Sequence, residues 1–169
     1  GSQLWLMAPD IAGRLSPRPA EPVAVRVMTY NLWNQNRDAD ATVRAILTSS
    51  ADVVAFPEPR WGHADLVLDR IKGAYPYQMS CLENRWCNLA IVSRRPFLSS
   101  GYHQGDWAGA DPDLLNLAWG VTTDRQGRPF TIAVTHHVWP SPNGLQEAQA
   151  RQLAAALDRC GFQGLVLAG

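Results

Sequence analysis

The sequence predicts an α/β or α+β domain, because short apolar segments typical of strands alternate with amphipathic segments typical of helices. The chain has 169 residues, which is enough for one domain with a core and short for two. Two strand-like segments also flank DRQGR (124–128), whose composition is typical of a hairpin turn. Together these features favour a single domain that combines sheets and helices.

Two strands and two helices are expected in the first half of the chain. VAVRVMTYN (23–31) has valine at alternate positions and predicts a strand. An aspartate cap followed by apolar residues at helical spacing predicts a helix over 38–50, and ADVVAF (51–56) predicts a second, buried strand. A second helix is expected over 60–73, with Gly73 as its C-terminal cap.

The second half predicts further strands around one long loop. The segment 98–113 has no clean period and is expected to form a functional or surface loop. The final GLVLAG, with four apolar residues between two glycines, is expected to be a fully buried strand. The other expected elements are a strand within 87–97 that stops before Pro96, hairpin strands over 115–123 and 129–137, and a helix over 145–160.

Composition and charge restrict the class of protein. Apolar residues make up 46% and charged residues 18% of the chain, as in globular proteins. Lysine plus arginine and aspartate plus glutamate both number 15, so the formal net charge is zero. That balance argues against non-specific electrostatic binding of nucleic acid, although an enzyme can still bind a phosphate through a metal. No apolar run approaches the roughly 20 residues of a membrane span.

The N-terminal residues and the cysteines suggest where the protein works. Gly1-Ser2 resembles a cloning scar, and 1–22 is expected to be a Pro-rich linker that follows an upstream segment, with membrane-anchored, extracytoplasmic attachment as one option. Cys81, Cys87 and Cys160 lack C-x-x-C spacing, so no structural zinc site is expected. Cys81 and Cys87 could pair in an exported protein or remain free thiols.

Polar residues follow three of the predicted strands directly. Asn31 follows the first strand, Glu58 emerges from the second between Pro57 and Pro59, and His136 ends the second hairpin strand. Sites in α/β sheets are built at such strand ends, and a carboxylate there suits a hard cation such as Mg²⁺. Each residue also has an ordinary interpretation, as a turn asparagine, a solvated glutamate or a structural histidine.

Taken in order, several segments resemble the endonuclease/exonuclease/phosphatase family, which includes pancreatic-type deoxyribonucleases, apurinic endonucleases, neutral sphingomyelinases and inositol-polyphosphate phosphatases. The resemblance spans residues 25–169. It rests on VRVMTYNLW, ADVVAFPEP, NLAIVSRRPF, FTIAVTHHVWP, QARQLAAAL and GLVLAG.

This resemblance implies a fold and a reaction. The fold is a four-layer α-β-β-α sandwich of two packed mixed sheets with outer helices, of which 23–169 would be the N-terminal portion. The reaction is hydrolysis of a phosphate ester by water, assisted by Mg²⁺ or Mn²⁺. Glu58 would be the main metal ligand, Asn31 would lie in the metal and phosphate network, and His136 would hydrogen-bond the scissile phosphate. Asn88 matches a position near the substrate.

The chain departs from the family pattern at two places. Pro57 stands where the family usually has glutamine, which could displace Glu58 or stiffen it. After a strand like LVLAG the family continues with Asp-Phe-Asn, whose aspartate acts on the attacking water, and a later histidine contacts the phosphate. Those residues are expected beyond Gly169, where the domain would be truncated or cleaved. The C-terminal remainder of the domain, which could be a separate chain, would complete the site. The 169 residues alone are expected to be inactive.

Two questions stay open at this level. A non-catalytic binding module that keeps the fold is the alternative to an enzyme, favoured by Pro57 and opposed by Asn31, Glu58 and His136. The substrate is a phosphate ester, whether nucleic acid, phospholipid headgroup or inositol phosphate. Six tryptophans could stack on bases, sit at a lipid interface or pack in the core: Trp33, Trp61, Trp86, Trp107, Trp119 and Trp139.

Overall fold

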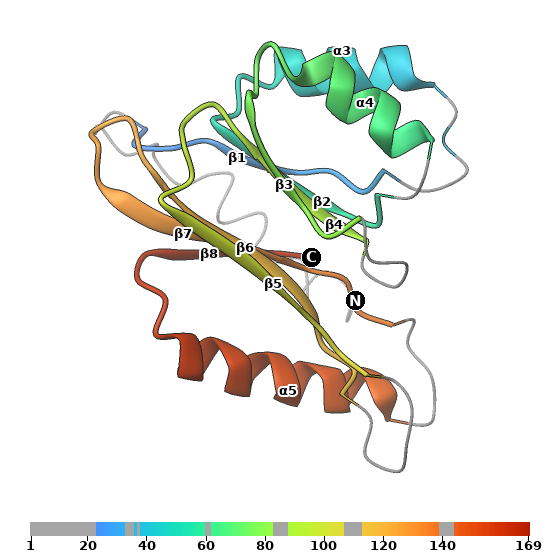
Figure 1. The fold of residues 1–169 in the computed structure, drawn as a ribbon, viewed down its shortest axis with the longest axis vertical. Helices are drawn as coiled ribbons and strands as arrows, with labels where there is room; N and C mark the ends of the chain where they lie inside the picture. The colour runs from blue at the N-terminus through green and yellow to red at the C-terminus, as the bar shows by residue number, and fades with distance from the viewer. Residues whose placement is uncertain are drawn as a thin grey trace, which may run out of the picture.

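The computed structural model describes residues 23–32, 36, 38–59, 62–82, 88–106, 113–138 and 144–169. Two four-stranded sheets pack face to face, and helices cover both outer faces (Figure 1). The first sheet has the order β1-β2-β4-β3, formed by β1 (Val27–Thr29), β2 (Val53–Pro57), β4 (Leu89–Ser93) and β3 (Tyr77–Ser80). The second has the order β5-β6-β7-β8, formed by β5 (Ser99–Gln104), β6 (Asn116–Thr123), β7 (Pro129–Thr135) and β8 (Leu165–Ala168).

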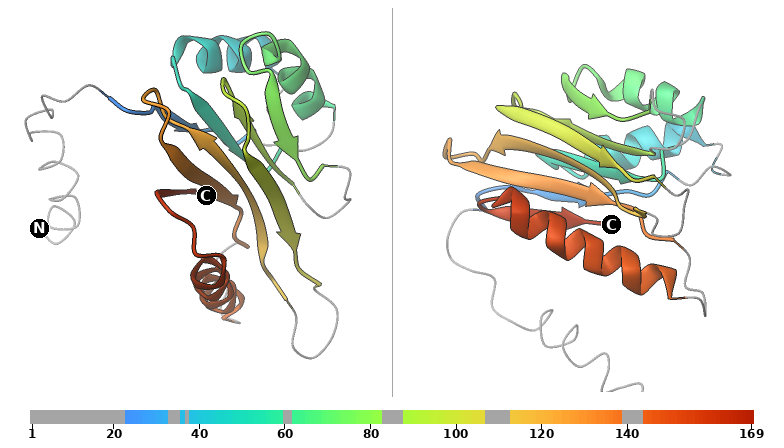
Figure 2. Two further views of the ribbon diagram at one scale, coloured as in Figure 1. Left: turned by 60° about the vertical axis from the view of Figure 1, so that its left-hand side comes forward. Right: turned by 60° about the horizontal axis from the view of Figure 1, so that its bottom comes forward.

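Both sheets are mixed. The pairs β1–β2 and β7–β8 are parallel, and the remaining pairs are antiparallel. Helices α3 (Ala39–Thr48) and α4 (His63–Ile71) lie over the first sheet, and α5 (Leu145–Cys160) lies under the second (Figure 2). The expected four-layer α-β-β-α sandwich is therefore confirmed for this portion of a domain.

The central strands are apolar on both faces because both faces are covered. In β2, Val54 and Phe56 pack with Ile46 of α3 and Ile71 of α4 on the outer side. The alternate β2 residues, Val53 and Ala55, face the second sheet. This double burial explains why ADVVAF is a continuous apolar run rather than an alternating one.

The inner layer joins the two sheets, and a third cluster fixes α5. Ile91 of β4 packs with Ile132 and Val134 of β7 between the sheets. On the other face of β7, Ala133 packs with Leu153 of α5. These contacts place the ends of β2, β4 and β7 on one rigid framework.

Several sequence-based expectations need correction. The 98–113 segment was expected to be a loop, but its first part forms β5; strand β3 was not expected at all. Both are edge strands with mostly exposed residues, so they lack the apolar pattern that marks a buried strand. Gly73 does not cap α4: the helix ends at Ile71, its C-cap is Lys72 with right-handed backbone geometry, and Gly73 does not adopt the left-handed conformation of a capping glycine.

Strand β8 is also less buried than its sequence indicates. Leu167 is 46% exposed, and only Ala168 of the four strand residues is buried. Within the described chain β8 pairs with β7 alone and so forms the edge of its sheet. The expectation of a fully buried strand is therefore wrong for these residues.

The remaining predictions concern cysteines, tryptophans and membrane spans. Cys81 is disulfide-bonded and Cys160 is free, while Cys87 lies outside the described residues. Trp119 packs between β6 and α5, with its ring centroid 5.4 Å from that of Phe162. The other tryptophans lie outside the described residues. None of the described helices has both the length and the apolar character to span a bilayer.

Candidate active site

Two of the residues singled out from the sequence approach one carboxylate oxygen of a third. Asn31 donates from its side-chain Nδ2 to Oε2 of Glu58 at 3.2 Å. Nε2 of His136 lies 3.7 Å from the same oxygen. The Glu58 side chain is 19% exposed and that of His136 is 29% exposed, so the cluster is sheltered and still accessible.

The strand topology explains this convergence. Strands β1 and β2 are parallel, so Asn31 and Glu58, which follow them, leave the first sheet at the same end. Strand β7 packs against β2 across the sandwich and delivers His136 from the second sheet. A site built from both sheets is therefore a direct consequence of how the sheets stack.

The backbone of Glu58 is held in an unusual conformation. Its φ angle is 59°, in the left-handed region that non-glycine residues rarely occupy. Its N–H donates to the carbonyl oxygen of Asn88 at 3.0 Å, which fixes the turn at the end of β2. Such strained residues cost about 1–3 kcal/mol and concentrate at functional sites.

The proline that replaces the family's glutamine stays within the sheet. Pro57 is the last residue of β2 and lies opposite Leu89 of β4. Glu58 follows immediately, with its carboxylate directed to Asn31 and His136. In this structure Pro57 thus does not prevent Glu58 from lying close to Asn31 and His136.

Asn88 enters the site through its main chain. Its carbonyl oxygen accepts the hydrogen bond from Glu58 N–H, and its side chain is half-buried. The structure thus brings Asn88 beside Glu58 and gives its backbone a positioning contact.

A residue that the sequence reasoning missed holds the His136 segment. Gln149 of α5 is completely buried. Its Oε1 accepts from Val138 N–H at 2.9 Å, and its Nε2 donates to the carbonyl oxygens of Leu114 at 2.9 Å and His136 at 3.3 Å. The available signal was a glutamine within the apolar stripe of the helix, four residues from both Leu145 and Leu153.

Asn116 is a second residue that the sequence reasoning did not single out. It opens β6, is 7% exposed, and its carbonyl oxygen accepts from Thr135 Oγ1 at 2.7 Å. Its Oδ1 is buried without a hydrogen-bond partner. Because strand residues alternate, Asn116 shares the inner face of β6 with Ala118 of the inter-sheet cluster. It therefore adds a buried amide oxygen without a hydrogen-bond partner at the end of the sandwich where Glu58 lies.

The oxygen donors present suit a hard divalent cation. Glu58 offers a carboxylate and Asn31 an amide oxygen, and Mg²⁺ typically binds one or two protein carboxylates and keeps waters for a phosphate substrate. Across the described ranges, no three His, Cys, Asp or Glu side chains are grouped as a metal site would require. The residues thus fit a cation that takes part of its coordination from other ligands.

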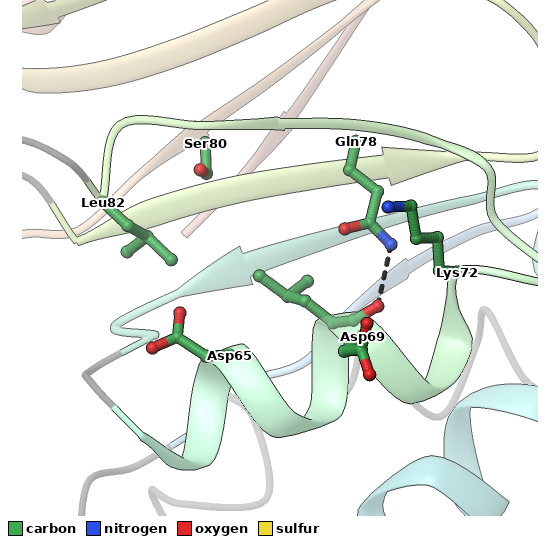
Figure 3. Close-up of a pocket in the computed structure, with 7 residues that line it drawn as sticks. Asp65, Asp69, Lys72, Gln78, Ser80 and Leu82 are labelled. Carbon is green, nitrogen blue, oxygen red and sulfur yellow. Dashed lines mark hydrogen bonds between the residues drawn. The ribbon is translucent and has the colours of Figure 1, made fainter.

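A shallow pocket elsewhere on the surface contains none of these residues. It lies between α4 and β3 and is lined by carboxylates of α4, by Lys72 and by Gln78 (Figure 3). Gln78 is fixed by a 2.9 Å hydrogen bond from its Nε2 to the carbonyl oxygen of Leu68. The converging cluster around Glu58 is therefore the better candidate for chemistry.

Comparison with known proteins agrees with this geometry. The model of the Endonuclease/Exonuclease/phosphatase family matches residues 28–168, nearly the whole described chain. The chain belongs to this family. Members of the endonuclease/exonuclease/phosphatase family are in general divalent-metal-dependent phosphoesterases and nucleases. A search of curated proteins gives no significant match.

Solved structures of the family share the fold at low sequence identity. SmcL superposes with a TM-score of 0.66 at 18% identity, over 87% of this chain and 62% of SmcL. A humanized D. rerio TDP2 gives 0.60 at 16% identity, over 85% of this chain and 59% of that chain. The human Nocturnin catalytic domain gives 0.57 at 20% identity, over 85% and 62%. The chain thus spans about three fifths of the length of these neighbours.

Proposed function

We propose that the complete domain is a metal-dependent phosphoester hydrolase of the phosphodiesterase or nuclease type. The observation that carries this proposal is the convergence of Asn31 and His136 on Oε2 of Glu58, contributed by two different sheets. A non-catalytic module would have no need to keep a strained glutamate between an amide and an imidazole.

Each of these residues has a role that its chemistry supports. Glu58 would hold Mg²⁺ or Mn²⁺, with Asn31 orienting the carboxylate or joining the metal ligands. When bound, such an ion polarises phosphoryl oxygens and stabilises the leaving oxygen. His136 would donate a hydrogen bond to a phosphate oxygen as negative charge grows there, and Asn88 would lie beside the substrate.

The group that activates water is proposed to come from polypeptide beyond these residues. Family resemblance places an aspartate and an asparagine directly after the strand corresponding to β8, and a histidine later. The chain covers about three fifths of its structural neighbours, which leaves room for those residues in the complete domain. We propose that this remainder, in the same chain or a separate one, packs beside β8.

A phosphodiester is the proposed substrate class. One neighbour, D. rerio TDP2, is described in complex with a single strand DNA product, and human Nocturnin with a bound sulfate anion. Sulfate is a tetrahedral dianion like phosphate. Both neighbours thus bind ligands with anionic tetrahedral groups, which supports a phosphate ester as the proposed substrate class.

We also propose an extracytoplasmic location, with membrane attachment through a segment upstream of the 1–22 linker. A disulfide at Cys81 favours an oxidising compartment, because thiols stay reduced in the cytosol.

The experiment combines metal affinity with hydrolysis. Mn²⁺ binding is measured by calorimetry for a chain extended past Gly169 and for its Glu58→Gln variant, with Glu147→Gln on α5 as an exposed control. We expect Glu58→Gln to abolish Mn²⁺ binding and the control to leave it intact. Unchanged affinity in Glu58→Gln would favour the non-catalytic module.

Hydrolysis of a chromogenic phosphodiester then tests the missing groups. With Mg²⁺ present, the extended chain is expected to hydrolyse the substrate. The rate of the 169-residue chain is expected to be lower by about 10²–10⁴-fold, which is the contribution of a general base. Equal activity in both chains would show that no residue beyond Gly169 takes part.

A further inference from the structure

Cationic side chains gather at one end of the sandwich, although the chain is neutral overall. At the end that holds Glu58, the described connections between elements carry the acidic side chains of Asp38, Glu58, Asp106 and Asp113. In sequence these connections also contain three arginines and two further acidic residues: Arg37, Arg60, Arg85, Glu83 and Asp111. The connections at the opposite end carry six cationic side chains, which we call the basic end: Arg26, Lys72, Arg94, Arg95, Arg125 and Arg128. Figure 1 shows the β6–β7 turn, the β4–β5 connection and the first described residues together at its left side.

Two carboxylates of the described connections, Asp52 and Asp124, are buried beneath the basic end, and the exposed Asp69 of α4 lines the shallow pocket together with Lys72. Asp52 pairs with Arg125 at 3.0 Å and with Arg95 at 3.5 Å, while its own side chain is 8% exposed. Asp124, equally buried, pairs with Arg128 at 2.8 Å. With Asp69 counted, three negative charges stand against six positive charges, an excess of three, and the cations paired with Asp52 and Asp124 are more exposed than those carboxylates.

The arginines are held by the fold rather than loosely attached to it. Arg94 donates from Nε to the carbonyl oxygen of Ala51 at 2.8 Å, and its guanidinium lies 4.7 Å from the centre of the Tyr75 ring. The Arg125 guanidinium is fixed by both oxygens of Asp52. A positioned cationic surface loses little side-chain freedom when it meets an anionic partner.

Exposed apolar side chains accompany these charges. Leu98 is 63% exposed, Val23 is 50% exposed and Tyr77 is 39% exposed, and all three belong to strand starts or connections at the basic end. Cationic side chains mixed with exposed aliphatic and aromatic residues are typical of protein surfaces that bind the membrane interface.

We propose that the basic end docks onto an anionic lipid surface. Aliphatic side chains gain nothing from a nucleic-acid backbone, whereas they can insert among lipid headgroups. The chain also enters the fold at this end, where the carbonyl oxygen of Ala24 accepts from Arg125 N–H at 3.0 Å. The proposal concerns the end remote from Glu58 and stands whether or not the domain is catalytic.

Docking in this orientation bears on the substrate. Asn31, Glu58 and His136 lie at the other end of the sandwich, so they face the aqueous phase when the basic end contacts the bilayer. Headgroups of that same bilayer cannot reach them. The orientation therefore selects a soluble phosphate ester over a phospholipid of the supporting membrane.

Vesicle co-sedimentation tests the proposal with the 169-residue chain, and it needs neither metal nor activity. We expect binding to phosphatidylcholine vesicles that contain phosphatidylglycerol and none to phosphatidylcholine alone, with loss of binding as NaCl is raised. The double variant Arg26→Glu/Lys72→Glu should reduce binding by about tenfold or more, since each cation near an anionic surface contributes several-fold in affinity. Leu98→Ser should weaken binding at high salt in particular.

The matched control reverses two charges away from the basic end. Arg44→Glu/Arg151→Glu has the same net charge as the test variant, but Arg44 lies within α3 and Arg151 within α5. We expect it to bind vesicles like the unmodified chain. Equal losses of vesicle binding in both double variants would show that only the net charge matters, and this result would overturn the proposed docking surface. If the chain binds duplex DNA in fluorescence anisotropy and does not bind vesicles, the basic end is a nucleic-acid surface and the lipid proposal is overturned.

Discussion

Nε2 of Gln149, in the middle of α5, donates a hydrogen bond to the carbonyl oxygen of His136 at 3.3 Å. The other end of the same amide accepts from Val138 N–H at 2.9 Å. One buried glutamine thus spans the residue that approaches Glu58 and the residue two positions later. Because strand β7 ends at Thr135, this contact replaces sheet pairing as the support of the segment.

The first prediction is that Gln149→Leu loosens the His136 segment. The substitution leaves Val138 N–H and two carbonyl oxygens without partners, which should cost about 2 kcal/mol in free energy of unfolding. Amide hydrogen exchange at Val138 should accelerate while exchange in β7 stays slow. Gln152→Leu is the comparison, since Gln152 Oε1 accepts from Leu114 N–H in the neighbouring connection. Unchanged Val138 exchange in Gln149→Leu would contradict this support.

The buried parts of the fold follow from the sequence, and the edges do not. Strand β2 was predictable because ADVVAF is covered on both faces, and α3 because Asp38 caps it through a 2.8 Å hydrogen bond to Ala41 N–H. Strands β3 and β5 were not predictable from pattern, because their polar residues are paired on one side and face solvent. Both segments are strands because their backbones pair with β4 and β6, and such pairing cannot be recognised from amino-acid composition.

The candidate site, too, was only partly predictable from the sequence. Asn31, Glu58 and His136 could be named because each follows a strand that is apolar, and ordered motifs connected them. The left-handed backbone of Glu58 was not foreseeable, since glutamate has no preference for that region. The support from Gln149 depends on a contact between α5 and the end of β7, a distance in space that helical periodicity alone does not encode.

The second prediction separates phosphate stabilisation from metal binding. In the extended domain, His136→Ala should lower kcat by about 10²–10³-fold, because a donor aimed at the developing charge is lost. Mn²⁺ affinity should stay close to that of the unmodified domain, since Glu58 and Asn31 remain. His137→Ala is the adjacent control and should retain most activity. A large loss of Mn²⁺ affinity in His136→Ala would make the imidazole a metal ligand instead.

The third prediction uses the backbone strain at Glu58. Glycine adopts φ of about 60° freely, whereas a residue with a Cβ pays roughly 1 kcal/mol there. Glu58→Gly should therefore unfold at a higher temperature than Glu58→Ala, by a few degrees, in differential scanning calorimetry. Both variants should lose Mn²⁺ binding.

Asp69 in α4 provides the control for this comparison. It is exposed and helical, so Asp69→Ala should be more stable than Asp69→Gly, the reverse order. The same order at both positions would mean that Glu58 is not strained.

The fourth prediction concerns Asp52, the buried carboxylate beneath the basic end. Burial by itself raises the pKa of Asp52, but the hydrogen bond from Arg26 N–H and the hydrogen bond and charges of Arg125 and Arg95 outweigh it. The pKa of the folded protein is therefore lowered below the ordinary aspartate value. A lowered pKa stabilises the fold at every pH above the unfolded value of about 3.9, and this stability is lost as the pH falls through the folded value.

Asp52→Asn removes that contribution and leaves the guanidinium of Arg125 without its carboxylate partner. We expect a loss of about 2 kcal/mol near neutral pH, because hydrogen bonds to charged groups are worth that much. Urea denaturation at falling pH should show the gap between Asp52→Asn and the unmodified chain staying constant down to about pH 5 and closing below about pH 4. Asp158→Asn, exposed on α5, should show no gap at any pH. A gap that persists undiminished in acid would mean that the carboxylate acts through packing and not through its charge.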